Sequence, residues 1–140
     1  MDGKIKIYAF KLLSKRDYFS QELKRKLISK GFKTEDVEEV VEYLIEKGYI
    51  NDEKLKERMK EKAIEKGKSP LYLKKKLYQK GVSDSIEFSF EEEMNSALYL
   101  LRNKYKKGKN YKEIVKFLKY RGFSYEVIQE ASKKYLEEEE

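Results

Sequence analysis

LKRKLISKGF, residues 23–32, is a motif that recurs twice in similar form, as LKKKLYQKGV at 73–82 and as IVKFLKYRGF at 114–123. When the copies are aligned on their glycines, apolar residues stand eight and four places before the glycine, and another follows it. Apolar residues four apart share one face of a helix, so each copy predicts one short helix. The aligned residues are Leu23, Leu27, Lys30, Gly31 and Phe32, then Leu73, Leu77, Lys80, Gly81 and Val82, then Ile114, Leu118, Arg121, Gly122 and Phe123.

Each of these helices carries a start and a stop signal. The base before the glycine complements the negative end of the helix dipole. The glycine then takes the left-handed conformation that ends a helix, and the apolar residue after it folds back onto the last turn. Ser20, Ser69 and Asn110 stand where N-caps belong, and Pro70 suits a first helical position. We therefore expect three capped helices of the same design.

Further helical patterns flank each copy, and Gly48 and then Asn51 or Asp52 mark the end of one helix and the cap of the next. One such group of helices buries too little apolar surface to be stable alone, so neighbouring groups must share cores. We expect an all-α fold of three tandem three-helix repeats, residues 1–50, 51–90 and 91–140, forming an elongated, curved solenoid. The flanking helices are expected over residues 5–16, 35–47, 55–64, 83–90, 94–101 and 127–135.

The composition excludes several classes of function. The 140 residues include no Cys and no His, which rules out disulfides and removes the commonest zinc ligands and general base. No apolar run approaches the roughly 20 residues that span a bilayer, and the start, MDGKIKIYAF, lacks a signal-peptide core. We expect a cytoplasmic protein, monomeric, with no cofactor, no metal and no membrane contact.

Charge is distributed unevenly along the chain. The net charge is +7, a surplus that suits a polyanionic partner such as nucleic acid. Residues 54–81 hold 11 basic and 3 acidic side chains, and residues 102–121 hold 9 and 1, whereas residues 34–53 hold 8 acidic side chains and 1 basic. Phosphates would be drawn to the two basic segments through counterion release.

A base also stands six places before each glycine, at Arg25, Lys75 and Lys116, roughly opposite the apolar pair. The plain alternative for any one of them is a solvated helix face. Tyrosines interleaved with these bases, at positions 72, 78, 105, 111 and 120, either stack on unpaired bases or pack half-buried. The predicted nucleic-acid or filament contacts are Lys24, Arg25, Arg58, Lys74, Lys75, Tyr78, Lys104, Lys106, Lys107, Lys109, Lys112, Lys116, Lys119 and Arg121.

Three further features are open to a plain reading. The loop KYKKGKN, residues 104–110, either grips a phosphate strand or is a charged connector. Arg121 caps a helix as readily as it contacts a phosphate. The tail Glu137–Glu140 opposes the dipole at a helix C-terminus, so we expect it to fray and to act as a solubilising tail.

Signals for catalysis are weak. GKS at residues 67–69 is a fragment of a phosphate-binding loop, but Lys62 stands where the full pattern needs glycine, and a helical pattern precedes it in place of a strand. The acidic residues cluster on helix surfaces without a defined pair, and a Ser/His/Asp or Cys/His set is impossible. We therefore expect that the protein is not an enzyme.

Four longer stretches resemble the RecX family of bacterial recombination regulators. The resemblance covers nearly the whole chain, and the order and spacing of the stretches make it specific. The family usually has an aromatic residue and then alanine where this chain has Leu55 and Lys56, so we expect that helix to pack differently in detail. The four stretches are LLSKRDYFSQELKRKLISKGF (12–32), YLIEKGYINDEKL (43–55), EKGKSPLYLKKKLYQKGV (65–82) and LKYRGFSYEVIQEA (118–131).

The resemblance implies an all-helical, non-enzymatic protein that binds the RecA recombinase and its filament on single-stranded DNA, lying in the filament groove. It implies inhibition of RecA's ATP hydrolysis, strand exchange and co-protease activity, with net filament disassembly and weaker binding to DNA itself. Two rivals explain the same residues. One is a stand-alone single-stranded nucleic-acid-binding repeat protein, and the other is a protein–protein adaptor with a highly charged surface.

Overall fold

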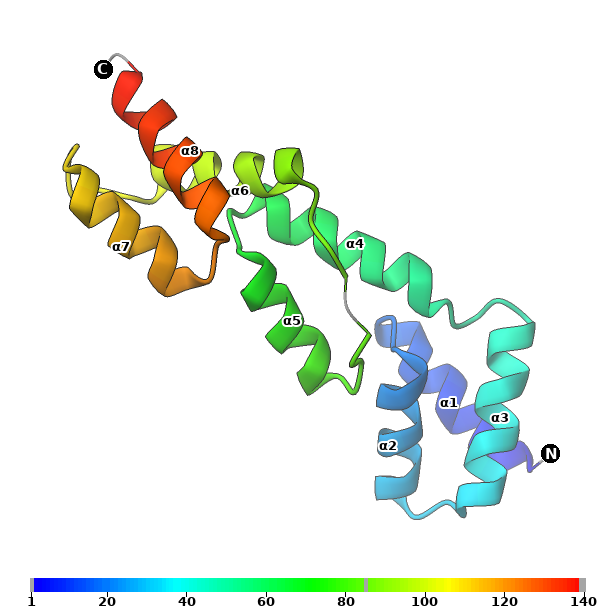
Figure 1. Ribbon diagram of the computed structural model, residues 1–140. Coiled ribbons are helices and arrows are strands. Elements are labelled where there is room, and N and C mark those ends of the chain that lie inside the picture. Colours follow the sequence, from blue (N-terminus) through cyan, green and yellow to red (C-terminus); the bar gives the residue numbers. More distant parts are fainter. Residues whose placement is uncertain (1, 85, 139–140) are drawn as a thin grey trace. The chain divides into compact units, whose positions relative to one another are not determined.

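The computed structural model describes residues 2–84 and 86–138, which form eight α-helices and no strand (Figure 1). The all-α fold class is therefore confirmed. The helices are α1 (Gly3–Lys15), α2 (Ser20–Lys30), α3 (Thr34–Glu46), α4 (Asp52–Glu65), α5 (Pro70–Gln79), α6 (Phe90–Asn103), α7 (Tyr111–Arg121) and α8 (Tyr125–Glu137).

The three copies of the repeated motif form α2, α5 and α7, and all three helices end in the same way. The apolar pairs eight and four residues before the glycines are at most 1% exposed, and burial of each such side chain contributes about 1.5–3 kcal/mol. Gly31, Gly81 and Gly122 have φ angles of 111°, 82° and 94°. The N–H after each glycine donates to the carbonyl five residues back, at 3.3, 2.9 and 3.3 Å. The predicted stop is thus confirmed in every copy.

The predicted N-caps are confirmed for α5 and α7 but wrong for α2. The Ser69 Oγ accepts the Tyr72 N–H at 3.1 Å, and the Asn110 side chain accepts the Glu113 N–H at 3.1 Å. In α2, Ser20 is the first helical residue and Phe19 is the cap residue.

A carboxylate from α4 explains the shift at Ser20. The Asp52 carboxylate accepts the Ser20 N–H at 2.9 Å and the Ser20 hydroxyl at 2.6 Å. It thereby satisfies a free N–H of the first turn of α2. Asn51 is then the cap of α4, and its side chain accepts the Lys54 N–H at 3.1 Å. Lys56, which departs from the family pattern, is buried, with its Nζ 2.9 Å from the Glu53 carboxylate.

The helix expected over residues 83–90 is absent from the described residues of that segment. Residues 82–84 and 86–89 are not helical, and α6 begins at Phe90. The physical reason is the strong start signal at Ser89. Its Oγ accepts the Glu92 N–H at 3.1 Å, while the Glu92 carboxylate accepts the Ser89 N–H at 2.8 Å. This capping box fixes the beginning of α6 and leaves too few residues for a separate helix.

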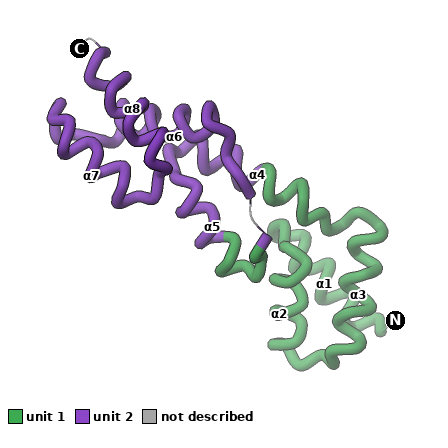
Figure 2. Tube along the Cα trace, viewed as in Figure 1, with its two compact units in different colours: residues 1–57, 77–83 green, residues 58–76, 84–140 purple. Residues whose placement is uncertain are grey.

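The chain divides into two compact units (Figure 2). Unit 1 comprises residues 1–57 and 77–83, and unit 2 comprises residues 58–76 and 84–140. The second predicted repeat is therefore shared between the units. The division into three repeats at the stated boundaries and their curved, elongated arrangement stay predictions.

Each unit has its own core, built from the predicted helix faces. In unit 1, α1, α2 and α3 pack on one another (Figure 1). In unit 2, α8 packs against both α6 and α7. The unit 1 core consists of Ile5, Ala9, Leu12, Tyr18, Leu23, Leu27, Val37, Val40, Val41, Leu44 and Ile50. The unit 2 core consists of Ala97, Leu98, Leu100, Leu101, Tyr105, Ile114, Leu118, Phe123, Val127, Ile128 and Ala131.

The repeated glycines also form close contacts between successive copies. A Cβ added at Gly81 would lie 3.1 Å from Arg25 and Gln21 of α2, and one at Gly122 would lie 2.4 Å from the Cβ of Leu71 in α5. Ser69 at the start of α5 also donates its hydroxyl to the Arg121 carbonyl. Gly31, in the first copy, meets nothing within 4 Å. The C-terminal end of α5 thus contacts α2, and that of α7 contacts α5.

Candidate functional site

The predicted contact residues lie on the surface. The bases six places before each glycine, Arg25, Lys75 and Lys116, are all exposed, while the apolar pair of the same helix is buried. Lys24 is half-buried, and the other members of the predicted set are exposed. The exposed residues are Arg25, Arg58, Lys74, Lys75, Tyr78, Lys104, Lys106, Lys107, Lys109, Lys112, Lys116, Lys119 and Arg121.

In unit 1 the face of α2 that carries Lys24 and Arg25 lies beside the end of α5. Arg25 extends over Gly81, since a Cβ there would lie 3.1 Å from its guanidinium carbon. Tyr78 is 73% exposed. Lys80 is held by Glu22, with 3.2 Å between Nζ and the carboxylate. Arg25 and Tyr78 are therefore the members of the predicted set that this part of the surface offers most openly.

Glu22 is the centre of this contact. Partial burial alone would raise the pKa of the Glu22 carboxyl, but hydrogen bonds from Arg16, the Phe19 N–H and Lys80 outweigh burial and hold that pKa below its usual value. The bonds from Arg16 and Phe19 measure 3.0 and 3.1 Å. The carboxylate is therefore charged at neutral pH, and it links α2 to the end of α5.

In unit 2 the exposed face of α5 carries Lys74 and Lys75 beside Tyr72. The ammonium groups of Lys68 and Lys76 lie 4.9 and 5.9 Å from the centre of the Tyr72 ring. The face of the ring attracts both ammonium groups, so Lys68 and Lys76 are partly engaged by Tyr72. Lys74 and Lys75 are therefore the more open bases of this helix.

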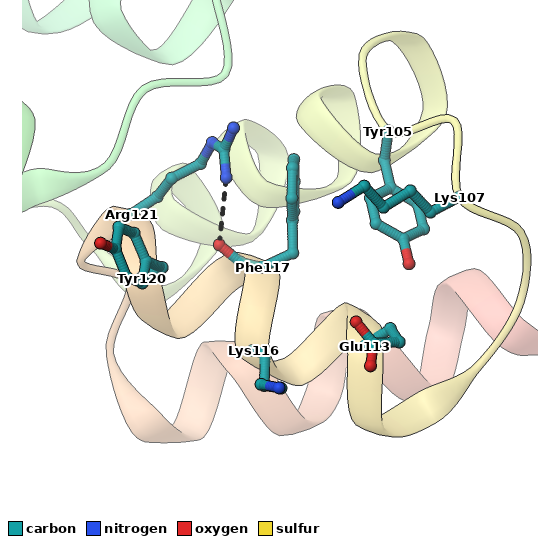
Figure 3. Close-up of a pocket in the computed structure, with 7 residues that line it drawn as sticks. All are labelled: Tyr105, Lys107, Glu113, Lys116, Phe117, Tyr120 and Arg121. Atoms are coloured by element: carbon teal, nitrogen blue, oxygen red, sulfur yellow. Dashed lines mark hydrogen bonds between the residues drawn. The ribbon is translucent and has the colours of Figure 1, made fainter.

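A shallow pocket of about 210 Å³, which we call the α7 pocket, lies beside α7 (Figure 3). Five of its residues recur along α7 at intervals of three and one, so that they share one helix face. Tyr105 and Lys107 come from the loop before α7. The Phe117 ring packs edge-on against the Tyr105 ring, with 4.8 Å between centroids. The lining residues are Tyr105, Lys107, Glu113, Lys116, Phe117, Tyr120 and Arg121.

Arg121 serves both α7 and the pocket. Its guanidinium carbon lies 3.7 Å from the centre of the Phe117 ring, and Nη1 donates to the Phe117 carbonyl at 3.4 Å (Figure 3). The first contact is a stacked cation–π pair, and the second places a positive charge on a carbonyl near the helix C-terminus. The capping role expected for Arg121 is thus present, and its side chain still lines the pocket.

Tyr105 cannot stack on a base, contrary to one reading of the interleaved tyrosines. It is 5% exposed, and its hydroxyl is one of two buried side-chain polar atoms without a hydrogen-bond partner among the described residues. Burial, with a smaller effect of the Glu113 charge, raises the pKa of Tyr105. The hydroxyl therefore remains protonated, and it is buried although Tyr105 is one of the residues that line the α7 pocket.

Lys109 has a structural role that the sequence did not reveal. Its Nζ donates to the backbone carbonyls of Tyr135 and Glu138 at 3.2 and 2.7 Å, and it lies 4.9 Å from the Tyr135 ring centre. A cation at these last carbonyls satisfies and stabilises the C-terminus of α8. Of the basic loop, Lys107 reaches the α7 pocket while Lys109 holds α8.

The helix α8 ends at Glu137, the first residue of the expected acidic tail, and Glu138 has extended backbone. The Glu138 carboxylate nevertheless accepts hydrogen bonds from Arg102. Fraying of the tail stays a prediction. The Arg102 hydrogen bond holds the pKa of Glu138 below its usual value. Glu139 and Glu140, also part of the expected tail, lie outside the described residues.

The structure brings three of the predicted bases, Lys107, Lys116 and Arg121, together in one pocket. Sequence reasoning left Glu113 and Phe117 out of the predicted contacts, and it offered Tyr120 as one of five tyrosines that either stack on bases or pack half-buried. Their spacing with Lys116 and Arg121 along one helix face was the signal that would have found them. Within residues 2–84 and 86–138 no cluster of acidic side chains is placed to hold a metal ion. Nor is any helix there both long and apolar enough to cross a bilayer.

Known proteins resemble this chain over most of its length. A family model described as RecX, first three-helix domain, matches residues 6–44. Regulatory protein RecX of Vibrio vulnificus (strain CMCP6) is 35% identical over 133 residues, which cover 88% of this chain and 87% of the relative. Regulatory protein RecX of Legionella pneumophila (strain Corby) is 36% identical over 135 residues, which cover 89% and 90%.

A solved structure shows the same fold. The crystal structure of RecX from Lactobacillus salivarius matches with a TM-score of 0.79 over 94% of each chain, at 22% sequence identity. Together with the helix order, this match confirms the all-helical repeat fold.

Proposed function

The chain belongs to the RecX family, and from this premise we propose that it is a non-enzymatic, cytoplasmic regulator of the RecA recombinase. The observation that carries the proposal is its identity of about one third, over nearly the full length, with proteins named regulatory protein RecX. The partner is the RecA filament on single-stranded DNA, as the resemblance in the four sequence stretches implies.

We propose that binding inhibits ATP hydrolysis, strand exchange and co-protease activity, and promotes net filament disassembly. The exposed bases of α2, α5 and α7 support a polyanionic partner, because a filament on DNA presents phosphates at regular intervals. Three bases in the same register, each on a helix of the same design, suit a target that is itself periodic.

The proposed mechanism is a population shift. A ligand shifts an equilibrium only by its differential affinity for the two states. The basic faces would therefore bind more tightly to the filament state that releases DNA than to the state that retains it. Neither ATP nor a metal ion bound by this chain is needed for such an effect.

Charge reversal tests the surface assignment. The double variant Lys75→Glu/Lys116→Glu should lose inhibition of RecA while keeping the helical circular dichroism of the native chain, because both side chains are exposed. The matched control is Lys4→Glu/Lys11→Glu, which makes the same change of charge on exposed positions of α1. The control should inhibit normally. Inhibition that survives in the Lys75/Lys116 variant shows that this surface is not the one used.

A stand-alone single-stranded nucleic-acid-binding protein is the second candidate. The observation in its favour is that Tyr78 and Tyr120 are 73% and 91% exposed beside bases, as in surfaces that stack unpaired bases. It predicts tight binding to single-stranded DNA with a steep salt dependence and without RecA. Binding to DNA that is weak until RecA is added argues against it.

A further inference from the structure

The α7 pocket combines positive charge with an open volume. Lys107, Lys116 and Arg121 line it, against the single carboxylate of Glu113. None of these three cations forms an ion pair with another residue that the structure describes. Cations that line one open volume without an ion-pair partner attract an anion to it.

One of the cations, Arg121, is placed by an aromatic contact. The Arg121 guanidinium is stacked on the Phe117 ring, which rests in turn on Tyr105. In Figure 3 the Phe117 ring stands between the Arg121 guanidinium and the Lys107 ammonium. A stacked guanidinium loses less conformational freedom on binding, and its N–H edges still match a phosphate group.

One further group faces solvent rather than the core. Tyr120 is 91% exposed at the rim, so its ring is almost wholly in water. An aromatic ring in that position offers a π-face for stacking.

The size and chemistry of the pocket select its occupant. A volume of about 210 Å³ is smaller than the roughly 300–1,000 Å³ of sites for whole drug-sized ligands. It suits a phosphate with its sugar, and leaves the attached base outside, at the rim where Tyr120 lies. An acidic peptide would use the cations but gains nothing from an exposed ring.

We propose that the α7 pocket binds one nucleotide of a single DNA strand, with the phosphates of that strand on Lys107, Lys116 and Arg121 and the base stacked on Tyr120. This inference rests on the proposed function, because it specifies how a regulator of a filament on DNA contacts the strand itself. The bases of α2 and α5 then contribute sequence-independent attraction, whereas the α7 pocket distinguishes unpaired DNA from other polyanions.

The test measures affinity of the full-length protein for a fluorescent oligothymidylate and for an abasic strand of equal length. Tyr120→Ala should weaken oligothymidylate binding roughly 5- to 100-fold, the range for loss of one stacked base. It should leave abasic-strand binding within about twofold. Lys116→Ala should weaken both and lower the slope of log affinity against log salt by about one. Tyr125→Ala, which removes another exposed tyrosine in unit 2, is the matched control and should change neither.

Several results overturn the inference. They are the absence of oligothymidylate binding, equal affinity for the two strands, and equal effects of Tyr120→Ala and Tyr125→Ala. Competition by polyglutamate as strong as by oligothymidylate also overturns it, and reassigns the pocket to an acidic protein surface.

Assays of RecA ATP hydrolysis on the same samples separate this inference from the proposed function. Inhibition by the native protein, with oligothymidylate binding unaffected by Tyr120→Ala, refutes the nucleotide site alone. A Tyr120-dependent affinity for oligothymidylate without any inhibition refutes the RecA proposal alone.

Discussion

The contact between Gly122 and Leu71 allows a sharp test of how successive copies of the repeated helix pack. We consider Gly122→Ala against Gly31→Ala. Both glycines have positive φ, 94° and 111°, and an alanine forced into the left-handed region costs about 1–2 kcal/mol. The two substitutions share this cost, and they share the smaller gain of about 0.4–1 kcal/mol that alanine brings by restricting the unfolded chain.

The two positions differ in what the new methyl group meets. At Gly31 a Cβ meets nothing within 4 Å, whereas at Gly122 it would lie 2.4 Å from the Leu71 Cβ and 2.7 Å from its Cδ2. The Leu71 Cβ is tied to the α5 backbone and cannot rotate away, so α5 or α7 must shift. Overpacking of this kind costs about 1–3 kcal/mol. We therefore expect Gly31→Ala to cost about 1 kcal/mol and Gly122→Ala about 2–4 kcal/mol.

The assay is urea denaturation followed by circular dichroism, with the difference between variants taken from the midpoints. Gly48→Ala serves as a second control, since Gly48 also has positive φ and open space around its Cβ direction. If Gly122→Ala and the two controls lose the same stability to within about 0.5 kcal/mol, the packing argument is refuted, because the added contact with Leu71 then costs nothing measurable.

Two further predictions concern charged contacts. The pKa of Glu22 is lowered in the folded protein, so its contribution is complete above the usual carboxyl pKa of 4.5 and is lost as the pH falls through the folded value. The difference in free energy of unfolding between the native chain and Glu22→Gln, measured by thermal unfolding, should therefore shrink as the pH falls below 4.5. A difference that is independent of pH contradicts the assignment. Arg102→Ala should speed amide hydrogen exchange in the last turn of α8. It should lower the free energy of unfolding by less than about 1 kcal/mol, because the pair with Glu138 is partly exposed. Lys104→Ala is its control, and equal exchange in the two variants would show that Arg102 does not hold this turn.

Most of the fold follows from local patterns in the sequence. The Leu positions of the three copies predict which face of α2, α5 and α7 is buried, and the Gly positions predict where these helices end. Both features depend on a few neighbouring residues only. The expected helix over 83–90 failed because its two central apolar residues, Ile86 and Phe88, alternate, and because Ser89 caps the next helix.

The errors at the helix ends arise from contacts distant in sequence. The Ser20 N–H and hydroxyl are satisfied by Asp52, 32 residues away. The carbonyls at the end of α8 are satisfied by Lys109, 26 and 29 residues away. No local pattern reports such partners, so the sequence indicated a cap at Ser20 that the structure lacks, and it did not indicate the contacts of Lys109 with the end of α8.

The candidate site divides in the same way. Exposure of the bases on the predicted helix faces followed from helical spacing alone. The α7 pocket did not, because it needs Tyr105 and Lys107, which the loop before α7 brings onto that helix. The burial of Tyr105, and with it the separation of packing tyrosines from exposed ones such as Tyr120, likewise depends on the tertiary structure.

The most direct test of the central claim is a titration of this protein into RecA that is hydrolysing ATP on single-stranded DNA. A regulator of the filament should inhibit hydrolysis at well below one copy per recombinase. Absence of inhibition, or inhibition only when the protein is abundant enough to coat the DNA, would contradict the account and favour a stand-alone DNA-binding protein.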